Sequence, residues 1–330
     1  MHSEKQDVWR NTVMAEKSPY ILVLTHDIDA LSLKELPLRG RTFWGFIYRS
    51  LIVNFWRFLR RDLGIREYLQ SLMCVLLLPL IKLGLAKDPW RESLHRMLEI
   101  EKQYGVRSTL FFIPISRTPG HTPEGKQAPS NRAAYYDLQA YAGLLQRLVR
   151  EGWEVGVHGI DAYRDLESAK AELQAIRRLL PGINKVGIRI HWLYHLGAET
   201  WKILEAAGYA YDATFGWNDR IGFPEGQYRP FRPKGISNLV VLPLNIQDGA
   251  LLGEWRQFLS NKEAWEQVEC LLTEAKKVGA VVTVLWHNNS FATPRFWGWL
   301  YERILERAQQ DGAYICRAID VVEMFLNGEL

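Results

Sequence analysis

The stretch "YILVLTHDID" (residues 20–29) decides the fold prediction. Its first half is apolar, as a buried strand would be, and its end places His26, Asp27 and Asp29 within four positions. Carboxylates gathered at one strand end repel each other unless something offsets their charge, and a bound cation is the usual offset. Because residues two apart on an extended chain face the same way, Asp27 and Asp29 are candidates for one cation site. A helix cap at Asp29 and a turn at Asp27 would also explain the pattern.

Short apolar segments alternate with longer helical patterns along the chain. The strand pattern is found at 20–25, 107–113, 153–158, 186–190, 209–213, 239–243, 281–286 and 313–316. The helical pattern is found between them, at 90–104, 136–151, 165–179, 198–207, 261–278 and 296–310. This alternation predicts a parallel β/α sheet or barrel, in which the chemistry lies at the carboxyl ends of the strands.

Further polar side chains stand at the ends of three later strand patterns. "EVGVHGID" (154–161) ends on His158, "VGIRIHW" (186–192) carries Arg189 and His191 two positions apart, and "VLWH" (284–287) ends on His287. Three histidines and two carboxylates at strand ends fit a site for a divalent metal, with groups to spare for acid–base chemistry.

Together these segments resemble the polysaccharide deacetylase family (carbohydrate esterase family 4, NodB-type domain) in its Asp-x-Asp subgroup. The resemblance runs from about residue 20 to 320 and is interrupted at 39–88. "LTHDID" (24–29) is similar to the first family motif and "STLFFIP" (108–114) to the second barrel strand. "EVGVHG", "GIRIHW" and "LWH" are similar to the second, third and closing motifs. The resemblance implies one α/β domain over 1–330, a distorted (β/α)7-type barrel with an amphipathic helical insertion (39–88) after the first strand.

The same resemblance implies roles for individual residues. Asp27 would be the catalytic base, Arg189 would orient that base, and His287 would be the general acid. Asp29 and His158 would bind the metal.

The chain departs from the family at two positions. Ala162 stands where the second motif normally supplies another histidine, and His191 stands where the third motif normally has proline. We therefore expect His191 to complete a set with Asp29 and His158; Asp161 is the alternative third ligand. One aspartate and two histidines favour a divalent metal, with zinc the expected ion.

These roles predict a metal-dependent hydrolase that removes an N-acyl group, expected to be acetyl, from an amino sugar of a glycan or a lipid-linked glycan. The alternatives are a deformylase or other amide hydrolase on the same barrel, and a non-catalytic protein that binds glycan or lipid. The stretch 211–226 is similar to a loop that lines the site in some family members. Substrate contacts are expected from Trp192, Asp212, Asp219 and Arg220.

The insertion has a pattern of its own. "IYRSLIVNFWRFLRR" (47–61) gathers its polar and basic side chains within about 140° of a helical wheel. "SLMCVLLLPLIKLGL" (71–85) contains Pro79 and Lys82 and is shorter than the roughly 20 apolar residues of a membrane span. We expect residues 42–86 to lie on an anionic membrane surface with the basic face toward the headgroups. Packing on the barrel and a dimer contact are the alternatives.

The charge balance gives no indication of a nucleic-acid partner, because 41 Lys and Arg face 37 Asp and Glu. Three widely separated cysteines are expected to be free thiols in a reducing compartment. Residues 1–19 are polar and charged, so no secretory signal is predicted. We expect a cytoplasmic protein, peripheral on the inner face of the cytoplasmic membrane if the insertion binds lipid.

Overall fold

The structure is a computed structural model that describes residues 18–330. The prediction that residues 1–19 contain no secretory signal therefore concerns positions outside the described residues, apart from 18 and 19.

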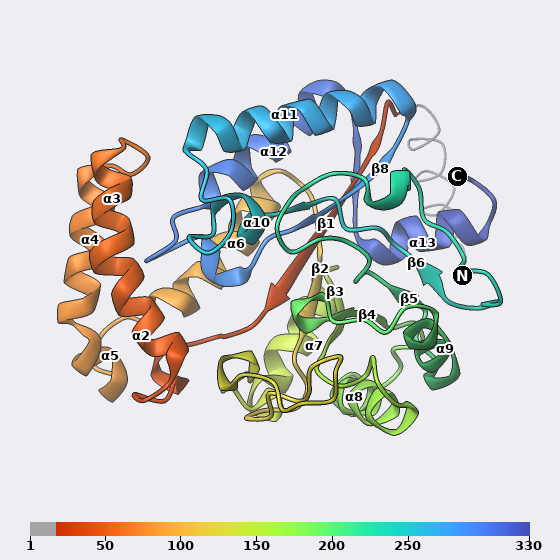
Figure 1. The fold of residues 1–330 in the computed structure, drawn as a ribbon, viewed down its shortest axis with the longest axis horizontal. Coiled ribbons are helices and arrows are strands. Elements are labelled where there is room, and N and C mark those ends of the chain that lie inside the picture. Colours follow the sequence, from red (N-terminus) through yellow and green to blue (C-terminus); the bar gives the residue numbers. More distant parts are fainter. Residues whose placement is uncertain (1–17) are drawn as a thin grey trace.

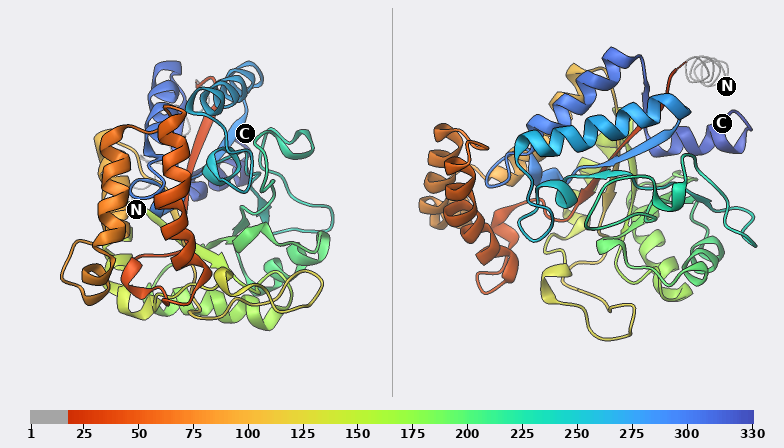
Figure 2. Two further views of the ribbon diagram at one scale, coloured as in Figure 1. Left: turned by 60° about the vertical axis from the view of Figure 1, so that its left-hand side comes forward. Right: turned by 45° about the horizontal axis from the view of Figure 1, so that its top comes forward.

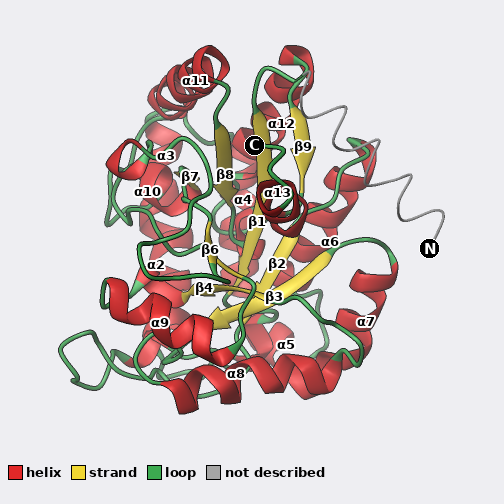
Figure 3. Cartoon of the chain, turned by 90° about the vertical axis from the view of Figure 1, so that its right-hand side faces the viewer, coloured by secondary structure: helices red, strands yellow, loops and turns green. Residues whose placement is uncertain are grey.

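The centre of the fold is a curled, all-parallel β-sheet (Figures 1 and 3). Hydrogen bonds connect its strands in the order β6-β5-β4-β3-β2-β1-β8-β7. β9 pairs with the first half of β1 and β2 with its second half, so these two strands share one edge of β1. Within residues 18–330 the strands are β1 (Ile21–Ile28), β2 (Thr109–Phe112), β3 (Glu154–Gly159), β4 (Gly187–Ile190), β5 (Tyr211–Asp212), β6 (Val240–Val241), β7 (Ile246–Gln247), β8 (Val281–Leu285) and β9 (Tyr314–Cys316).

This architecture confirms the predicted α/β fold of the barrel type. In the described part of the chain the end strands β6 and β7 do not pair with each other, so the barrel is open between them. All eight predicted strands are present. β7 was not predicted, because a two-residue strand is too short to show a period of two.

Helices surround the sheet, most of them on its outside (Figure 1). They are α6 (Pro89–Gln103), α7 (Ala142–Arg150), α8 (Leu166–Leu179), α9 (Ala198–Ala207), α10 (Asp248–Leu252), α11 (Asn261–Val278), α12 (Gly298–Asp311) and α13 (Ala318–Leu326). α10 and α13 were not predicted. α13 packs against the amino ends of β1 and β8, where Val321 and Val322 share an apolar cluster with Ile21.

The two faces of β1 pack in separate apolar clusters. Leu22 and Leu24 pack with the covering helices, whereas Ile21 and Val23 fill the interior of the barrel. Because side chains alternate along a strand, the interior face continues through position 25 to Asp27. The alternation of β1 therefore directs Asp27 into the mouth of the barrel.

The insertion forms a helical hairpin at one end of the molecule (Figures 1 and 2). Its first arm runs without a break through α2 (Arg41–Tyr48), a π-helical segment (Arg49–Val53) and α3 (Asn54–Leu59). Its second arm consists of α4 (Ile65–Leu76) and α5 (Leu78–Leu83). A small cluster that includes Phe46, Cys74 and Trp90 joins the hairpin to the barrel. Within residues 18–330 no helix combines the length and the apolar character that a membrane span requires.

Part of the predicted basic face of the first arm is turned toward the barrel, whereas Arg60 and Arg61 of that face are exposed. Arg57 is buried and donates hydrogen bonds to the Asn54 side chain (3.2 Å) and to the Arg295 carbonyl (2.7 Å). Arg49 forms an ion pair with Glu254 beside the mouth of the barrel. These arginines face the barrel, because a partly buried cation is stable only where carbonyls and carboxylates surround it. Phe46 is buried on the same inward side, whereas Trp44 and Trp56 are exposed.

Candidate active site

Five of the predicted site residues meet at the carboxyl edge of the sheet. Asp27 and Asp29 come from the end of β1, and His158 from the end of β3. His191 directly follows β4, and His287 follows β8. The parallel order of these strands brings five side chains from four distant segments to one place.

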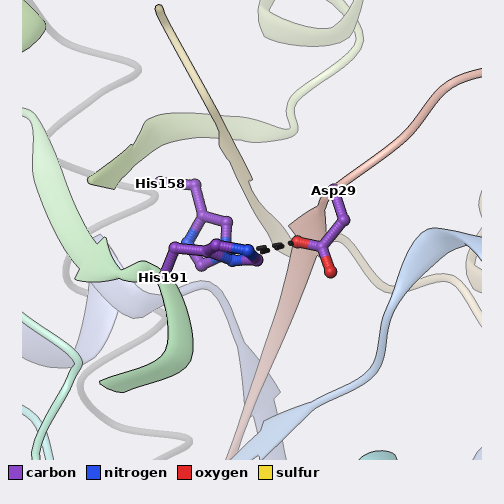
Figure 4. A group of neighbouring side chains, drawn as sticks. All are labelled: Asp29, His158 and His191. Carbon is purple, nitrogen blue, oxygen red and sulfur yellow. Dashed lines mark hydrogen bonds and ion pairs between the residues drawn. The ribbon is translucent and has the colours of Figure 1, made fainter. Parts of the chain in front are cut away.

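Asp29, His158 and His191 form a compact group of possible metal ligands (Figure 4). Asp29 Oδ1 lies 3.3 Å from His158 Nε2 and 3.4 Å from His191 Nδ1. The two imidazole nitrogens lie 2.7 Å apart. Tetrahedral ligands at zinc distances of 2.0–2.1 Å are separated by about 3.3 Å, close to two of these three spacings.

Two further observations fit a cation at this place. Asp29 Oδ1 is buried without a hydrogen-bond donor, although an unpaired buried carboxylate oxygen is costly. The His158 Nδ1–H donates to the Arg189 carbonyl (2.9 Å), so the lone pair of His158 lies on Nε2, the nitrogen that is near Asp29 and His191. The donor set and its orientation therefore suit a divalent metal.

The protonation states in this group also favour metal binding. Burial lowers the pKa of His191 well below its ordinary value, so the imidazole is neutral. Burial alone would raise the pKa of Asp29, but the neighbouring histidines, with the protonated His287 among them, lower it below its usual range. A neutral imidazole and an ionised carboxylate are the forms that bind metals.

Asp27 lies beside this group and is held by Arg189. The Arg189 guanidinium donates to Asp27 Oδ1 (3.1 Å) and to the Thr25 hydroxyl (2.7 Å), and it is completely buried. Its Nε–H donates to the Ala213 carbonyl, which fixes the plane of the guanidinium. The other oxygen of Asp27, Oδ2, lies 3.5 Å from His158 Nε2. Asp27 thus has one oxygen held and one facing the possible metal site.

His287 approaches the group beside Asp29. Its Nε2 lies 3.6 Å from Asp29 Oδ2. Its Nδ1–H donates to Asp248 Oδ1 (2.6 Å), and its backbone N–H donates to Asp248 Oδ2 (2.9 Å). Burial opposes the charge of His287, but the Asp248 carboxylate outweighs it and raises the pKa of His287 to about 9. Burial likewise opposes the charge of Asp248, but His287 lowers the pKa of Asp248 to about 2.

Asp248 is one of two residues near the site that the sequence did not predict. It directly follows β7, so it obeys the same rule as the other site residues, namely a polar side chain at the carboxyl end of a strand. The segment "LNIQDG" (244–249) gave the only available signal, but its strand is two residues long. Arg295 was also missed; it donates to Asn289 and Ser290 and borders the same cavity as His287.

The alternative ligand Asp161 lies apart from the metal group. Its carboxylate accepts hydrogen bonds from the His121 ring (2.8 Å) and from the His121 backbone N–H (2.9 Å). Among the described residues the possible ligand group contains His191 and not Asp161. The structure thus places His191, and not Asp161, beside Asp29 and His158.

A cavity of about 310 Å³ opens over these residues. Asp27, Asp29, His191 and His287 form its floor, and Trp192 lines its wall. Trp192 has φ 63°, an uncommon conformation for a bulky residue, which turns its ring toward the cavity beside His191. The cavity therefore gives a substrate access to the possible base, the possible acid and the metal group together.

The other three predicted substrate contacts lie elsewhere. Asp212 is fully buried and accepts hydrogen bonds from Trp201 and from the Thr214 backbone, so it has a structural role and does not reach the cavity. Asp219 and Arg220 are exposed in the loop after β5, outside the cavity lining, and Arg220 stacks on Trp217. Their neighbour Asn218 lines the cavity instead.

His26, the third polar residue of the opening stretch, points to the opposite face of β1. Its ring is fully buried and contacts the Glu101 carboxylate (2.7 Å) and the Trp286 carbonyl (2.7 Å). Trp153 and Tyr301 donate to the same carboxylate. His26 is therefore part of a polar network inside the core and not of the site.

Comparison with known proteins gives structural similarity alone. No family model matches the sequence, and no curated protein matches it. A Mycobacterium smegmatis protein assigned as a polysaccharide deacetylase is similar at a TM-score of 0.55 and 15% identity, over 95% of this chain and 92% of that chain. Puue Allantoinase is similar at a TM-score of 0.57 and 14% identity, over 94% of this chain and 91% of that chain. A Pseudomonas aeruginosa PAO1 protein, also assigned as a polysaccharide deacetylase, is similar at a TM-score of 0.57 and 13% identity, over 94% of this chain and 92% of that chain. At such identities these similarities establish the fold, which is the one that the motif resemblance implied.

Proposed function

We propose that this protein is a metal-dependent hydrolase that removes an N-acyl group, most simply acetyl, from an amino sugar of a glycan. One observation carries the proposal: Asp27 lies against His158 and His287 against Asp29 of the Asp29–His158–His191 group, and each is fixed by its own buried partner. A hydrolase that cleaves an amide needs a base, an acid and a means of polarising the carbonyl in one cavity. The fold shared with two proteins assigned as polysaccharide deacetylases supports the same conclusion.

Asp29, His158 and His191 would hold the metal. A divalent ion in such a site supplies Lewis-acid chemistry, because it polarises a carbonyl and makes water acidic near neutral pH. Zinc suits a set of one carboxylate and two imidazoles, and three protein ligands leave a position open.

Asp27 would act as the base. Its Oδ2 faces the metal group, whereas Oδ1 is occupied by Arg189, so a proton taken from water would arrive at Oδ2. The buried Arg189 positions the carboxylate through its hydrogen bond to Oδ1. Water would add its oxygen to the acyl carbon as Asp27 accepts the proton.

His287 would act as the acid. Asp248 keeps its imidazole protonated and holds Nδ1, so the proton available for transfer is the one on Nε2, which faces the cavity. Transfer of this proton to the sugar nitrogen would allow the C–N bond to break. The products would be a carboxylic acid and a free amino sugar. A formyl group would be removed by the same residues.

The preserved base and acid favour catalysis over binding alone, because a protein that only binds glycan has no need of either group. The test is release of acetate or formate from N-acylated amino sugars by zinc-loaded protein, with Asp27→Asn as the matched control of equal size. We expect the wild type to release the acid, and we expect chelation of the metal to abolish this release. No release by zinc-loaded wild type from soluble and lipid-linked acyl amino sugars would overturn the proposal.

A further inference from the structure

The first arm of the insertion presents a row of large apolar side chains to solvent. In the described structure its exposed positions recur every three or four residues, which is one face of a helix: Trp44, Tyr48, Ile52, Phe55, Trp56 and Leu59. The opposite side of the arm carries the buried polar residues Asn54 and Arg57. That side also holds the buried Phe43, Phe46 and Val53, so the arm differs from an ordinary surface helix in that it exposes a second row of apolar side chains.

The second arm repeats the pattern. Its exposed apolar side chains also follow helical spacing: Ile65, Leu69, Met73, Leu76, Leu80 and Leu83. The two arms lie side by side at the end of the molecule, and among the described elements none covers their outward side (Figure 2). We call these two rows together the outer face.

The outer face is unlike the rest of the described surface. Of 22 large apolar side chains that are exposed there, 15 lie between residues 38 and 85. Soluble monomers rarely expose contiguous apolar patches larger than a few hundred Å², and larger ones mark interaction sites. The outer face therefore fits an apolar partner.

The charges of the insertion restrict the chemistry of that partner. Its exposed ionisable side chains are cations only: Arg39, Arg41, Arg60, Arg61, Arg66 and Lys87. The nearby carboxylates of Asp62 and Glu67 are half-buried, and Asp62 is paired with Arg60. An apolar face with cations around it complements a surface that is anionic outside and apolar within, as an anionic bilayer is.

The outer face is continuous with the mouth of the candidate active site. Trp44 and Tyr48 border a cavity of about 600 Å³ that extends to Asp29 and His191. Trp255, on the loop after α10, stacks on Tyr48 at 6.3 Å and is 75% exposed. An aromatic rim thus connects the apolar surface with the catalytic cavity.

We propose that the outer face docks on an anionic lipid bilayer and that the substrate is an amino sugar linked to a lipid of that bilayer. The lipid part stays among the apolar side chains while the sugar enters the cavity over Asp27 and His287. The substrate class rests on the proposed function, whereas membrane docking does not. A second copy of the chain fits the face less well, because a symmetric contact would bring the arginines of both copies together.

The test is flotation of the purified full chain with vesicles of phosphatidylcholine, alone or mixed with phosphatidylglycerol. We expect the protein to float with the mixed vesicles. Salt should weaken this binding without abolishing it, because the apolar contribution is not screened. The variant Ile52→Gln/Trp56→Gln/Leu69→Gln/Leu76→Gln should reduce the bound fraction at least about tenfold, because four apolar contacts with lipid are lost. All four positions are exposed, and circular dichroism would verify that the variant is folded.

A matched control replaces four exposed apolar residues outside the insertion: Val149→Gln, Leu166→Gln, Val278→Gln and Leu326→Gln. It should float like the wild type. Docking is overturned if the wild type stays unbound, if the two quadruple variants bind alike, or if the outer-face variant instead dissociates a dimer that binds no vesicles. Flotation requires no turnover. Protein that floats but hydrolyses nothing would therefore refute the proposed function alone, and protein that hydrolyses a soluble acyl amino sugar but does not float would refute docking alone.

Discussion

His158 Nε2 and His191 Nδ1 lie 2.7 Å apart although 33 positions separate the two residues in the chain. β3 and β4 pair in parallel with His158 opposite Arg189, and His191 lies two positions further on the same face. The chain has Ala162 where the resemblance leads one to expect a histidine, and His191 where it leads one to expect proline. The pairing of β3 with β4 brings His191 beside His158, in the group that Asp29 completes.

The first prediction concerns metal content. We expect His191→Ala to lower the bound zinc as strongly as His158→Ala does, by at least about tenfold in affinity, because each removes one of three ligands. Metal analysis of the purified variants measures this. Asp161→Ala is the control, since its carboxylate binds His121 and should leave the metal content unchanged. Full metal in His191→Ala together with loss in Asp161→Ala would show that the ligand assignment is wrong.

The second prediction concerns the base. Asp27→Asn should keep the metal and lose at least about two orders of magnitude in kcat, the usual scale for a general acid–base group. The asparagine keeps an oxygen for Arg189, so the fold should be unaffected. Steady-state rates and metal content, measured on the same preparation, separate loss of the base from loss of the metal. Turnover near the wild-type rate would remove Asp27 from the mechanism.

The third prediction concerns pH. The acid must be protonated to act, and Asp248 raises the pKa of His287 to about 9, so wild-type activity should fall only as the pH rises through about 9. In Asp248→Asn the raising interaction is lost while burial remains, which lowers the pKa of His287. The alkaline limb of the kcat profile should therefore move to lower pH. An unmoved limb would mean that another group donates the proton.

The fourth prediction separates the core from the site. Glu101→Ala should destabilise the fold by about 3–5 kcal/mol, because it leaves the buried His26 ring and three other donors without their acceptor. Chemical denaturation measures the loss. Metal affinity should be unchanged, since Glu101 lies on the opposite face of β1 from Asp29. Loss of metal in a folded Glu101→Ala protein would contradict this separation.

The fifth prediction concerns the inward face of the insertion. Arg57→Ala should destabilise the protein by about 1–3 kcal/mol, because the Arg295 carbonyl and the Asn54 amide oxygen lose a buried donor. Arg66→Ala is the control, since Arg66 is exposed on the second arm and should change stability by less than about 0.5 kcal/mol. Equal unfolding curves for the two variants would show that Arg57 makes no stabilising contact.

Much of the site could be predicted from the sequence because its signals are local. A polar residue after an apolar run marks the end of a strand wherever the strand is long enough, as for Asp27 after β1 and His287 after β8. Parallel sheets bring such ends together, so the strand pattern already implied that these residues would converge. Asp248 was not predicted, because β7 is only two residues long and its carboxylate contacts His287, which is 39 positions away in the chain.

By itself the sequence determined the alternation of strands and helices, the strand-end positions of the site residues, and the two-faced character of the insertion, because each depends on periodicity over a few residues. Only the tertiary structure decided that His191 joins the metal group and that Asp161 binds His121 instead, because strand register sets which side chains meet. It also decided that Arg49 and Arg57 of the first arm face the barrel while Arg60 and Arg61 stay exposed, because a helical pattern separates two faces but does not state which one is buried. Here Glu254 and the Arg295 carbonyl on the barrel provide partners for Arg49 and Arg57, and a row of large apolar side chains is left outside.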